Sequence, residues 1–253
     1  MACRIRATIV CLAVGGALLA AGVASAAPLE VAPSLEFRLE SVSYGYPYIA
    51  NPELSAGADG TYSSVGVGQF GNLGMAWSVV VDPDPFIAGT LILTNLSPTA
   101  DTFTVTGTLP ASPLGGPNVM GGFLGMITFT DTSGDGAVTL STVGATPFYQ
   151  AMIDGSPVLP LGSLGSFSLP VIGGPGVFGT VSQQSFGAPI PSAPAPAVGA
   201  SIGVVLKFTL SGQDKVEIPF RFEVAAASVP EPSALLLMGL ALVGIAARRL
   251  KRS

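Results

Sequence analysis

Two runs near the C-terminal end of the chain, residues 204–210 and 216–224, alternate apolar with mostly polar side chains. A period of two residues places the apolar side chains on one face of an extended strand, whereas an amphipathic helix needs a period of 3.6. The polar segment 211–214 separates the two runs, and this arrangement predicts a β-hairpin. Pro219 lies on the polar face and has no amide hydrogen, so we expect its strand near a sheet edge.

Other segments of the chain also have the composition of β-strands. Residues 35–40 and 102–109 alternate clearly, and six further strands are expected at 75–81, 89–95, 123–130, 137–143, 148–153 and 178–182. Clusters of Asp, Asn, Pro and Gly separate them, while the glycine-rich segments 55–74 and 157–176 allow no assignment. The expected fold of residues 27–228 is therefore a single all-β domain, an antiparallel β-sandwich or jelly-roll-like structure.

The charge of this expected domain is strongly negative. Residues 27–228 contain four basic and 14 acidic side chains, a net charge of −10. Such a surface repels the phosphate backbone, which excludes nucleic acid as a partner. Both cysteines, Cys3 and Cys11, precede the domain, so it contains neither a disulfide nor a thiol nucleophile.

Residues 1–26 have the features of a secretory signal peptide. Arg4 and Arg6 precede an apolar stretch at residues 7–19. The expected cleavage point is surrounded by three small residues, Ala24, Ala26 and Ala27. We therefore expect export, with a mature chain that begins at about residue 27.

The C-terminal segment, residues 229–253, has three parts. The first is a proline-containing motif formed by Val229, Pro230, Glu231 and Pro232. An uncharged apolar run follows at residues 234–247, which as a helix would extend about 21 Å. The third part is a basic cluster formed by Arg248, Arg249, Lys251 and Arg252. Because basic residues after an apolar run stay on the cytoplasmic side, the segment predicts a transmembrane helix with the domain outside.

This tripartite tail resembles the PEP-CTERM sorting signal of Gram-negative bacteria. The resemblance implies that an exosortase-type membrane protease recognises the Pro-Glu-Pro motif, after transient anchoring in the inner membrane. It also implies a final place at the cell surface or in the extracellular matrix, and a link to exopolysaccharide and biofilm. The alternative is an ordinary single-pass anchor. Residues 82–109 resemble, more weakly, the passenger domains found ahead of such tails, and that resemblance implies no catalytic residue.

One segment matches the letters of a hydrolase nucleophile elbow, with Ser201 at the centre of residues 199–203. That motif requires a strand–turn–helix context and a histidine base. The chain has no histidine, and the residues after Ser201 alternate like a strand. The absence of histidine also argues against most serine-based catalysis and the common zinc sites, so no catalytic residue is assigned.

A calcium-binding loop is suggested by residues 131–136. Asp131, Ser133 and Asp135 occupy the first, third and fifth positions of such a loop, and a glycine follows at the sixth. The twelfth position, however, holds Thr142 in place of the bidentate glutamate. An Asp- and Gly-rich β-turn explains the same residues without a metal. We expect no cofactor other than calcium bound weakly here.

Two acidic pairs are candidates for a glycosidase, which needs two carboxylates converging on one bond. Asp82 and Asp84 lie in an expected turn, and Glu217 and Glu223 share the outer face of one expected strand. Neither pair is placed in space by the sequence alone.

Aromatic residues suggest a different activity. Tyr44, Tyr46 and Tyr48 alternate and, with Trp77, would suit a surface on which sugar rings stack, although aromatics packed on the core would give the same pattern. The leading hypothesis is a non-enzymatic exported surface or matrix protein associated with exopolysaccharide. The alternatives are a carbohydrate- or calcium-binding module and a carboxylate-based surface hydrolase.

Overall fold

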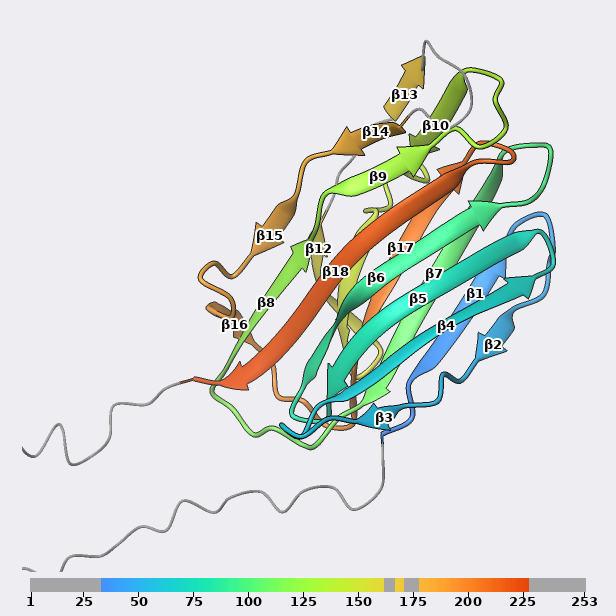
Figure 1. Ribbon diagram of the computed structural model, residues 1–253. Helices are drawn as coiled ribbons and strands as arrows, with labels where there is room; N and C mark the ends of the chain where they lie inside the picture. The colour runs from blue at the N-terminus through green and yellow to red at the C-terminus, as the bar shows by residue number, and fades with distance from the viewer. Residues whose placement is uncertain (1–32, 162–166, 171–177, 228–253) are drawn as a thin grey trace, which may run out of the picture.

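The computed structural model describes residues 33–161, 167–170 and 178–227 (Figure 1). In these residues every regular secondary-structure element is a β-strand, and every pair of neighbouring strands is antiparallel. The all-β antiparallel fold class is therefore confirmed. The expected signal-peptide and transmembrane helices lie outside the described residues. Within those residues no helix has the length and hydropathy that a membrane span requires.

The first sheet, sheet A, has the path β12-β11-β17-β7-β1-β2, and β10 connects β13 to β17. Its described strands are β1 (Glu36–Ser41), β2 (Tyr48–Ala50), β7 (Asp101–Pro110), β10 (Ala137–Ser141), β11 (Tyr149–Ile153), β12 (Ser156–Leu161), β13 (Phe167–Pro170) and β17 (Ser201–Leu210). The central pair is β17 and β7, which match over ten residues.

The second sheet, sheet B, has the path β14-β9-β18-β6-β5-β4-β3, and β8 pairs with β18, β15 and β16. Its described strands are β3 (Ser55–Ala56), β4 (Tyr62–Phe70), β5 (Leu73–Asp82), β6 (Phe86–Asn95), β8 (Asn118–Leu124), β9 (Ile127–Thr130), β14 (Phe178–Val181), β15 (Gln184–Phe186), β16 (Ala193–Ala195) and β18 (Lys215–Ala226).

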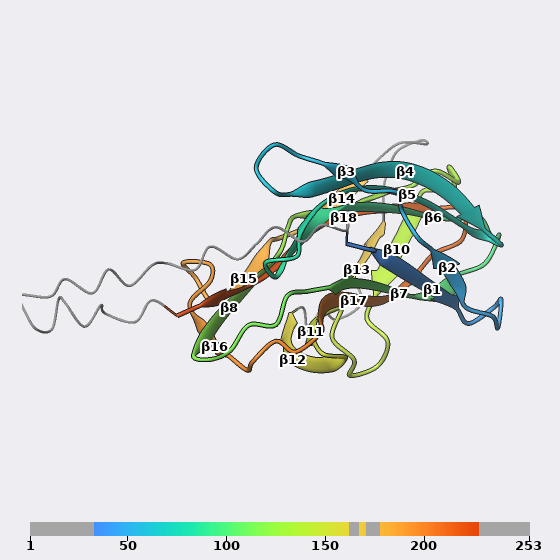
Figure 2. The ribbon, with the colours of Figure 1, turned by 90° about the horizontal axis from the view of Figure 1, so that it is seen from below.

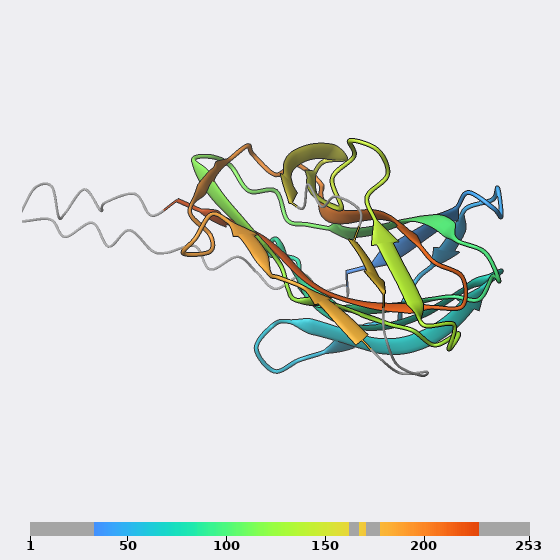
Figure 3. The same cartoon turned by 90° about the horizontal axis from the view of Figure 1, so that it is seen from above.

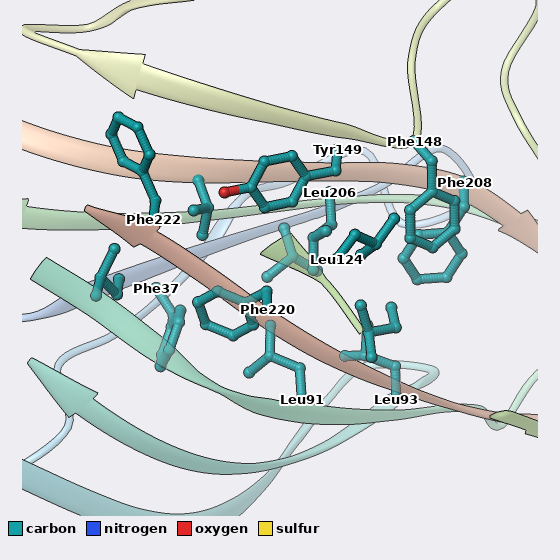
Figure 4. Packing of buried hydrophobic residues seen from close by; sticks show 14 of the residues in the cluster. Phe37, Leu91, Leu93, Leu124, Phe148, Tyr149, Leu206, Phe208, Phe220 and Phe222 are labelled. Atoms are coloured by element: carbon teal, nitrogen blue, oxygen red, sulfur yellow. The ribbon is translucent and has the colours of Figure 1, made fainter. Parts of the chain in front are cut away.

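The two sheets lie one above the other and enclose a single apolar core (Figures 2 and 3). The alternation seen in the sequence is the reason, because the apolar residues of β17 and β18 are buried while the intervening residues are only partly covered. Phe148 stacks on Phe208 at 5.3 Å between ring centroids. Tyr149 is fully buried and lies among the apolar side chains of the core (Figure 4). Its hydroxyl donates to the Arg221 carbonyl at 3.0 Å. This burial raises the pKa of the Tyr149 phenol.

The prediction that residues 204–210 and 216–224 form a β-hairpin is wrong. Both segments are strands with the expected buried faces, but β17 lies in sheet A and β18 in sheet B. The turn at residues 211–214 therefore crosses from one sheet to the other, so the apolar faces of the two strands meet across the core. The alternation shows which face of a strand is buried. It does not show whether the next strand pairs with it in the same sheet or faces it across the core, because both arrangements give the same alternation.

The expected edge position of Pro219 is also wrong, because β18 pairs with β6 on one side and with β8 and β9 on the other. The proline is tolerated by a break in the second ladder. Its carbonyl accepts a hydrogen bond from the Gly125 amide at 2.8 Å, between the end of β8 and the start of β9. The N and O of one strand residue point to the same side, so the missing N–H faces this break.

The break also explains why the single strand expected at residues 123–130 is two strands, β8 and β9. The other expected strands match β1, β5, β6, β7, β10, β11 and β14 within a few residues. The unassigned segment 55–74 contains the nine-residue strand β4, whose glycines concealed it. In that strand a Cβ on Gly66 would lie 2.2 Å from the Trp77 ring, so glycine is required for the indole to lie against the strand.

Candidate functional site

The loop between β1 and β2 is held in place by the buried Asp101, at the start of β7. The Ser43 amide donates to Asp101 Oδ1 at 3.2 Å, and the Ser41 hydroxyl donates to Asp101 Oδ2. The Val42 amide also donates to the Thr102 carbonyl at 3.0 Å. These bonds attach the loop to sheet A and fix the tyrosines that it carries.

The turn between β4 and β5 approaches this loop from sheet B. Gly71 and Asn72 form the turn, and Gly71 has a φ of +60°, in the left-handed region that favours glycine. A Cβ on Gly71 would lie 2.4 Å from the Tyr44 ring, which therefore rests against the turn. The Leu96 amide donates to the Asn72 carbonyl at 2.7 Å, and this hydrogen bond holds the turn in place.

Between the loop and the turn lies a hollow of about 300 Å³, which we call the tyrosine cleft. Its aromatic side chains are Tyr44, Tyr46, Tyr48 and Phe70. The three tyrosines are 54%, 79% and 46% exposed, and the Tyr48 and Phe70 rings are 3.9 Å apart between centroids. The cleft thus presents aromatic faces to solvent. Strands β1 and β4, which supply Ser41 and Phe70 to its lining, terminate at the same end of the sandwich (Figure 1).

Polar groups accompany these rings. Glu40, Ser41 and Gln69 line the cleft, and none of its lining residues is basic. The Glu40 carboxylate also accepts a hydrogen bond from Arg38 Nε at 2.8 Å, in an exposed ion pair. Flat apolar faces beside a few hydrogen-bonding groups suit a ligand that has both C–H faces and hydroxyls.

The structure brings the three predicted tyrosines together but places Trp77 elsewhere. The Trp77 ring lies 6.2 Å from Phe37 between centroids, and its Nε1 donates to the Ser64 hydroxyl at 3.1 Å. Phe70 was not singled out from the sequence, because it belongs to the glycine-rich segment in which no strand was assigned.

The calcium candidates Asp131, Ser133 and Asp135 do form one loop. The carboxylate of Asp131 accepts the amides of Gly134 at 2.6 Å and Gly136 at 2.9 Å, and it also accepts the Ser133 hydroxyl. These hydrogen bonds lower the pKa of Asp131, and the bond from the Gly134 amide has the largest effect. Asp131 is fully buried.

This arrangement is that of a carboxylate closing its own turn. The Asp135 carboxylate likewise accepts the Ala137 amide at 2.9 Å. In the described part of the chain no group of three or more His, Cys, Asp or Glu residues is placed to hold a metal. The hydrogen bonds of the turn account for these side chains without a metal, and calcium binding stays a prediction.

The first acidic pair, Asp82 and Asp84, lines a hollow of about 450 Å³. Arg221 and Glu223 line the same hollow. The Asp84 amide donates to Asp82 Oδ1 at 2.9 Å, and Arg221 pairs with Glu223. Burial is the main cause that raises the pKa of Asp82, and the nearby acidic charges raise it further. Glu217 does not join the group, since it lies six positions before Glu223 along β18, a span of roughly 20 Å.

The segment with the letters of a nucleophile elbow has a structural role. The amides of Gly199, Ala200 and Ser201 all donate to the Asp154 carboxylate, at 2.7, 2.7 and 2.9 Å. These three hydrogen bonds lower the pKa of Asp154, and the bond from the Ala200 amide has the largest effect. Ser201 then begins β17, where an elbow would begin a helix.

The signal-peptide and sorting residues lie outside the described residues, so no geometry is assigned to them. These are Ala24, Ala26 and Ala27, Val229 to Pro232, and the basic residues Arg248, Arg249, Lys251 and Arg252. Here the evidence comes from comparison. No curated protein and no solved structure matches the chain. Residues 228–252, however, match the PEP-CTERM protein-sorting motif. The chain thus carries a PEP-CTERM sorting segment, which implies an exported, membrane-anchored precursor that an exosortase processes.

Proposed function

We propose that residues 27–228 form a non-enzymatic carbohydrate-binding module that holds the exported protein on extracellular polysaccharide. The single observation that carries this proposal is the tyrosine cleft, in which three exposed tyrosines converge at one end of the domain. The sorting motif supports it, because an exported domain can meet the polysaccharide of an extracellular matrix.

The ligand class follows from the chemistry of the cleft. The C–H faces of a pyranose ring pack on exposed tyrosine rings, and its hydroxyls bond to groups such as the exposed amide of Gln69. The cleft has no basic lining residue, and the domain carries a net charge of −10. Because like charges repel, a neutral polysaccharide should bind in preference to one rich in carboxylates.

The acidic hollow supports a non-enzymatic domain more than a hydrolase. A glycosidase needs one protonated and one free carboxyl group facing the same bond. Here the Asp82 carboxylate accepts an amide of its own turn, and Glu223 is paired with Arg221. Both groups are thus already engaged within the protein.

The proposal is tested by affinity electrophoresis of the protein through gels that contain a neutral or a uronate-rich polysaccharide. The neutral polymer should retard the wild type. Tyr46→Ala should weaken that retardation about tenfold or more, since a central aromatic contact contributes over 1.4 kcal/mol. Tyr46 is 79% exposed, so the change should leave the fold intact.

Met126→Ala is the matched control, because Met126 is 55% exposed and does not line the cleft. It should bind like the wild type. Equal retardation of Tyr46→Ala and the wild type would remove the cleft as the binding site. Stronger retardation by the uronate-rich polymer would overturn the assigned ligand class.

Processing is tested separately by replacing Pro230, Glu231 and Pro232 with alanine. The apolar run and the basic cluster remain, so anchoring is kept, while alanine lets the helix extend into the motif. In a host with the matching exosortase, this variant should accumulate as an uncleaved precursor in the membrane fraction. Identical masses for variant and wild type would show that the tail is only an anchor.

A further inference from the structure

Strand β4 forms part of the edge of sheet B. On one side it pairs with β5 along its whole length. On the other side the short strand β3 covers only Tyr62 and Ser63. From Ser64 to Phe70, no strand in the described residues pairs with this second side.

The direction of the free backbone groups follows from the β3–β4 turn. The Gly57 amide donates to the Thr61 carbonyl at 2.7 Å, so Thr61 points its backbone groups toward the edge. Alternate residues of a strand point their backbone groups the same way. Val65 and Val67 therefore direct their N–H and C=O groups outward, and their side chains are 81% and 80% exposed.

This edge has none of the devices that keep exposed strands apart. Such strands usually carry lysine, proline, a bulge or an inward-pointing charge. Residues 61–81, which include all of β4 and most of β5, contain no charged residue and no proline. The ladder between β4 and β5 is also regular over nine residue pairs, without a bulge.

The sequence of β4 is complementary to itself in the antiparallel direction. Around Gly66, the order outward on each side is valine, a small residue, a polar residue and an aromatic ring. A two-fold axis at Gly66 therefore sets Val65 opposite Val67 of a second copy, and Ser64 opposite its Gly68. The valine pairs are those whose backbone groups face outward, so they would exchange the hydrogen bonds.

We propose that β4 pairs antiparallel with β4 of a second copy of this chain, about a two-fold axis at Gly66. Residues 61–81 carry no charge, so two copies of this edge meet without the local repulsion that charged side chains would create. An isologous pair also closes on itself and leaves no further edge of this kind. Pairing over residues 64–68 leaves β3 in its place.

The test is the molar mass of the full chain, purified in detergent micelles and measured by light scattering over a range of concentrations. The wild type should dimerise. Val65→Lys/Val67→Lys sets lysine opposite lysine in both valine pairs, and the dissociation constant should rise about tenfold or more. Val65→Lys/Val67→Glu sets opposite charges against each other in the same register, and it should restore the dimer.

Val42→Lys/Met126→Lys is the matched control, since it adds the same charge at two exposed positions outside β4. It should dimerise like the wild type. A monomeric wild type at 100 µM overturns the proposal. So does a dimer that persists in the double-lysine variant, which would place the interface elsewhere. Failure of the lysine–glutamate variant to restore the dimer overturns the antiparallel register at Gly66.

Discussion

Asn95 connects both of the nearby segments that cross between the sheets. Its side-chain amide, which is fully buried, donates to the carbonyls of Thr99, Leu210 and Ser211 at 2.9–3.1 Å. Its Oδ1 accepts the Ser97 amide at 2.9 Å. The first crossing leads from β6 to β7 and the second from β17 to β18. One side chain thus satisfies the backbone at both crossings.

We expect Asn95→Ala to lower the free energy of unfolding by about 2–4 kcal/mol, because it leaves several buried backbone groups without partners. Urea denaturation measures the change. Thr94→Ala is the control, since Thr94 is only partly buried and should change the free energy by less than about 1 kcal/mol. Equal effects of the two substitutions would contradict the role given to Asn95.

Asp154 should make stability depend on acid pH. Three backbone hydrogen bonds hold its folded pKa below the ordinary value of 3.8. The stability that it contributes is therefore fully present above that value and is lost as the pH falls through the folded pKa. Asp214 acts in the opposite sense, because burial raises its pKa and favours its protonated form.

Asp154→Asn isolates this effect, and asparagine tolerates the φ of 49° at this position. At pH 7 the variant should unfold at a lower urea concentration than the wild type. The difference should shrink as the pH falls from about 4 through the lower folded pKa, since the carboxylate is protonated first in the unfolded and then in the folded wild type. A difference that stays constant from pH 7 to pH 2.5 would show that the charge of Asp154 is not involved.

At the scale of strands, the alternation in the sequence predicts which residues are strands and which face is buried, and it does so well for β1, β7, β17 and β18. It does not predict the neighbour of each strand. Pairing depends on turn geometry and on contacts far apart in the chain, and the turn after β17 changes sheets. Three tyrosines of the cleft were visible as an alternating set, whereas Phe70 joins them only through the fold.

The break between β8 and β9 gives a prediction at this scale. A Cβ on Gly125 would lie 2.6 Å from Cβ of Pro219, so Gly125→Ala forces the two strands apart. We expect a loss of about 1–3 kcal/mol, seen as a fall in Tm of several degrees. Gly115→Ala is the control, since no atom lies within 4 Å of its Cβ. A similar Tm for both variants would contradict the close approach.

In the whole molecule, the tyrosine cleft and the C-terminal end of the domain lie at opposite ends of the sandwich. The chain leaves β18 at Ala226 toward the sorting segment, while the cleft lies where β1 and β4 terminate (Figure 1). The cleft is therefore remote from the point at which the sorting segment follows the described domain.

Pairing through β4 would then arrange two clefts in one particle. The Phe70 positions of two antiparallel copies lie eight residues apart along the joined strands, roughly 27 Å, and the clefts are at opposite ends. The described C-terminal ends of the two copies, after β18, then lie at opposite ends of the dimer. Each dimer should therefore connect two polysaccharide segments.

If both proposals hold, the wild-type protein should cross-link a neutral polysaccharide, and light scattering should rise and then fall as protein is added in excess. Val65→Lys/Val67→Lys should still bind the polymer but should produce no rise, because each particle has one cleft. Tyr46→Ala should dimerise yet also produce no rise, because its clefts do not bind. A rise that survives the double-lysine substitution would mean that bivalence does not come from β4, even if the cleft is the binding site.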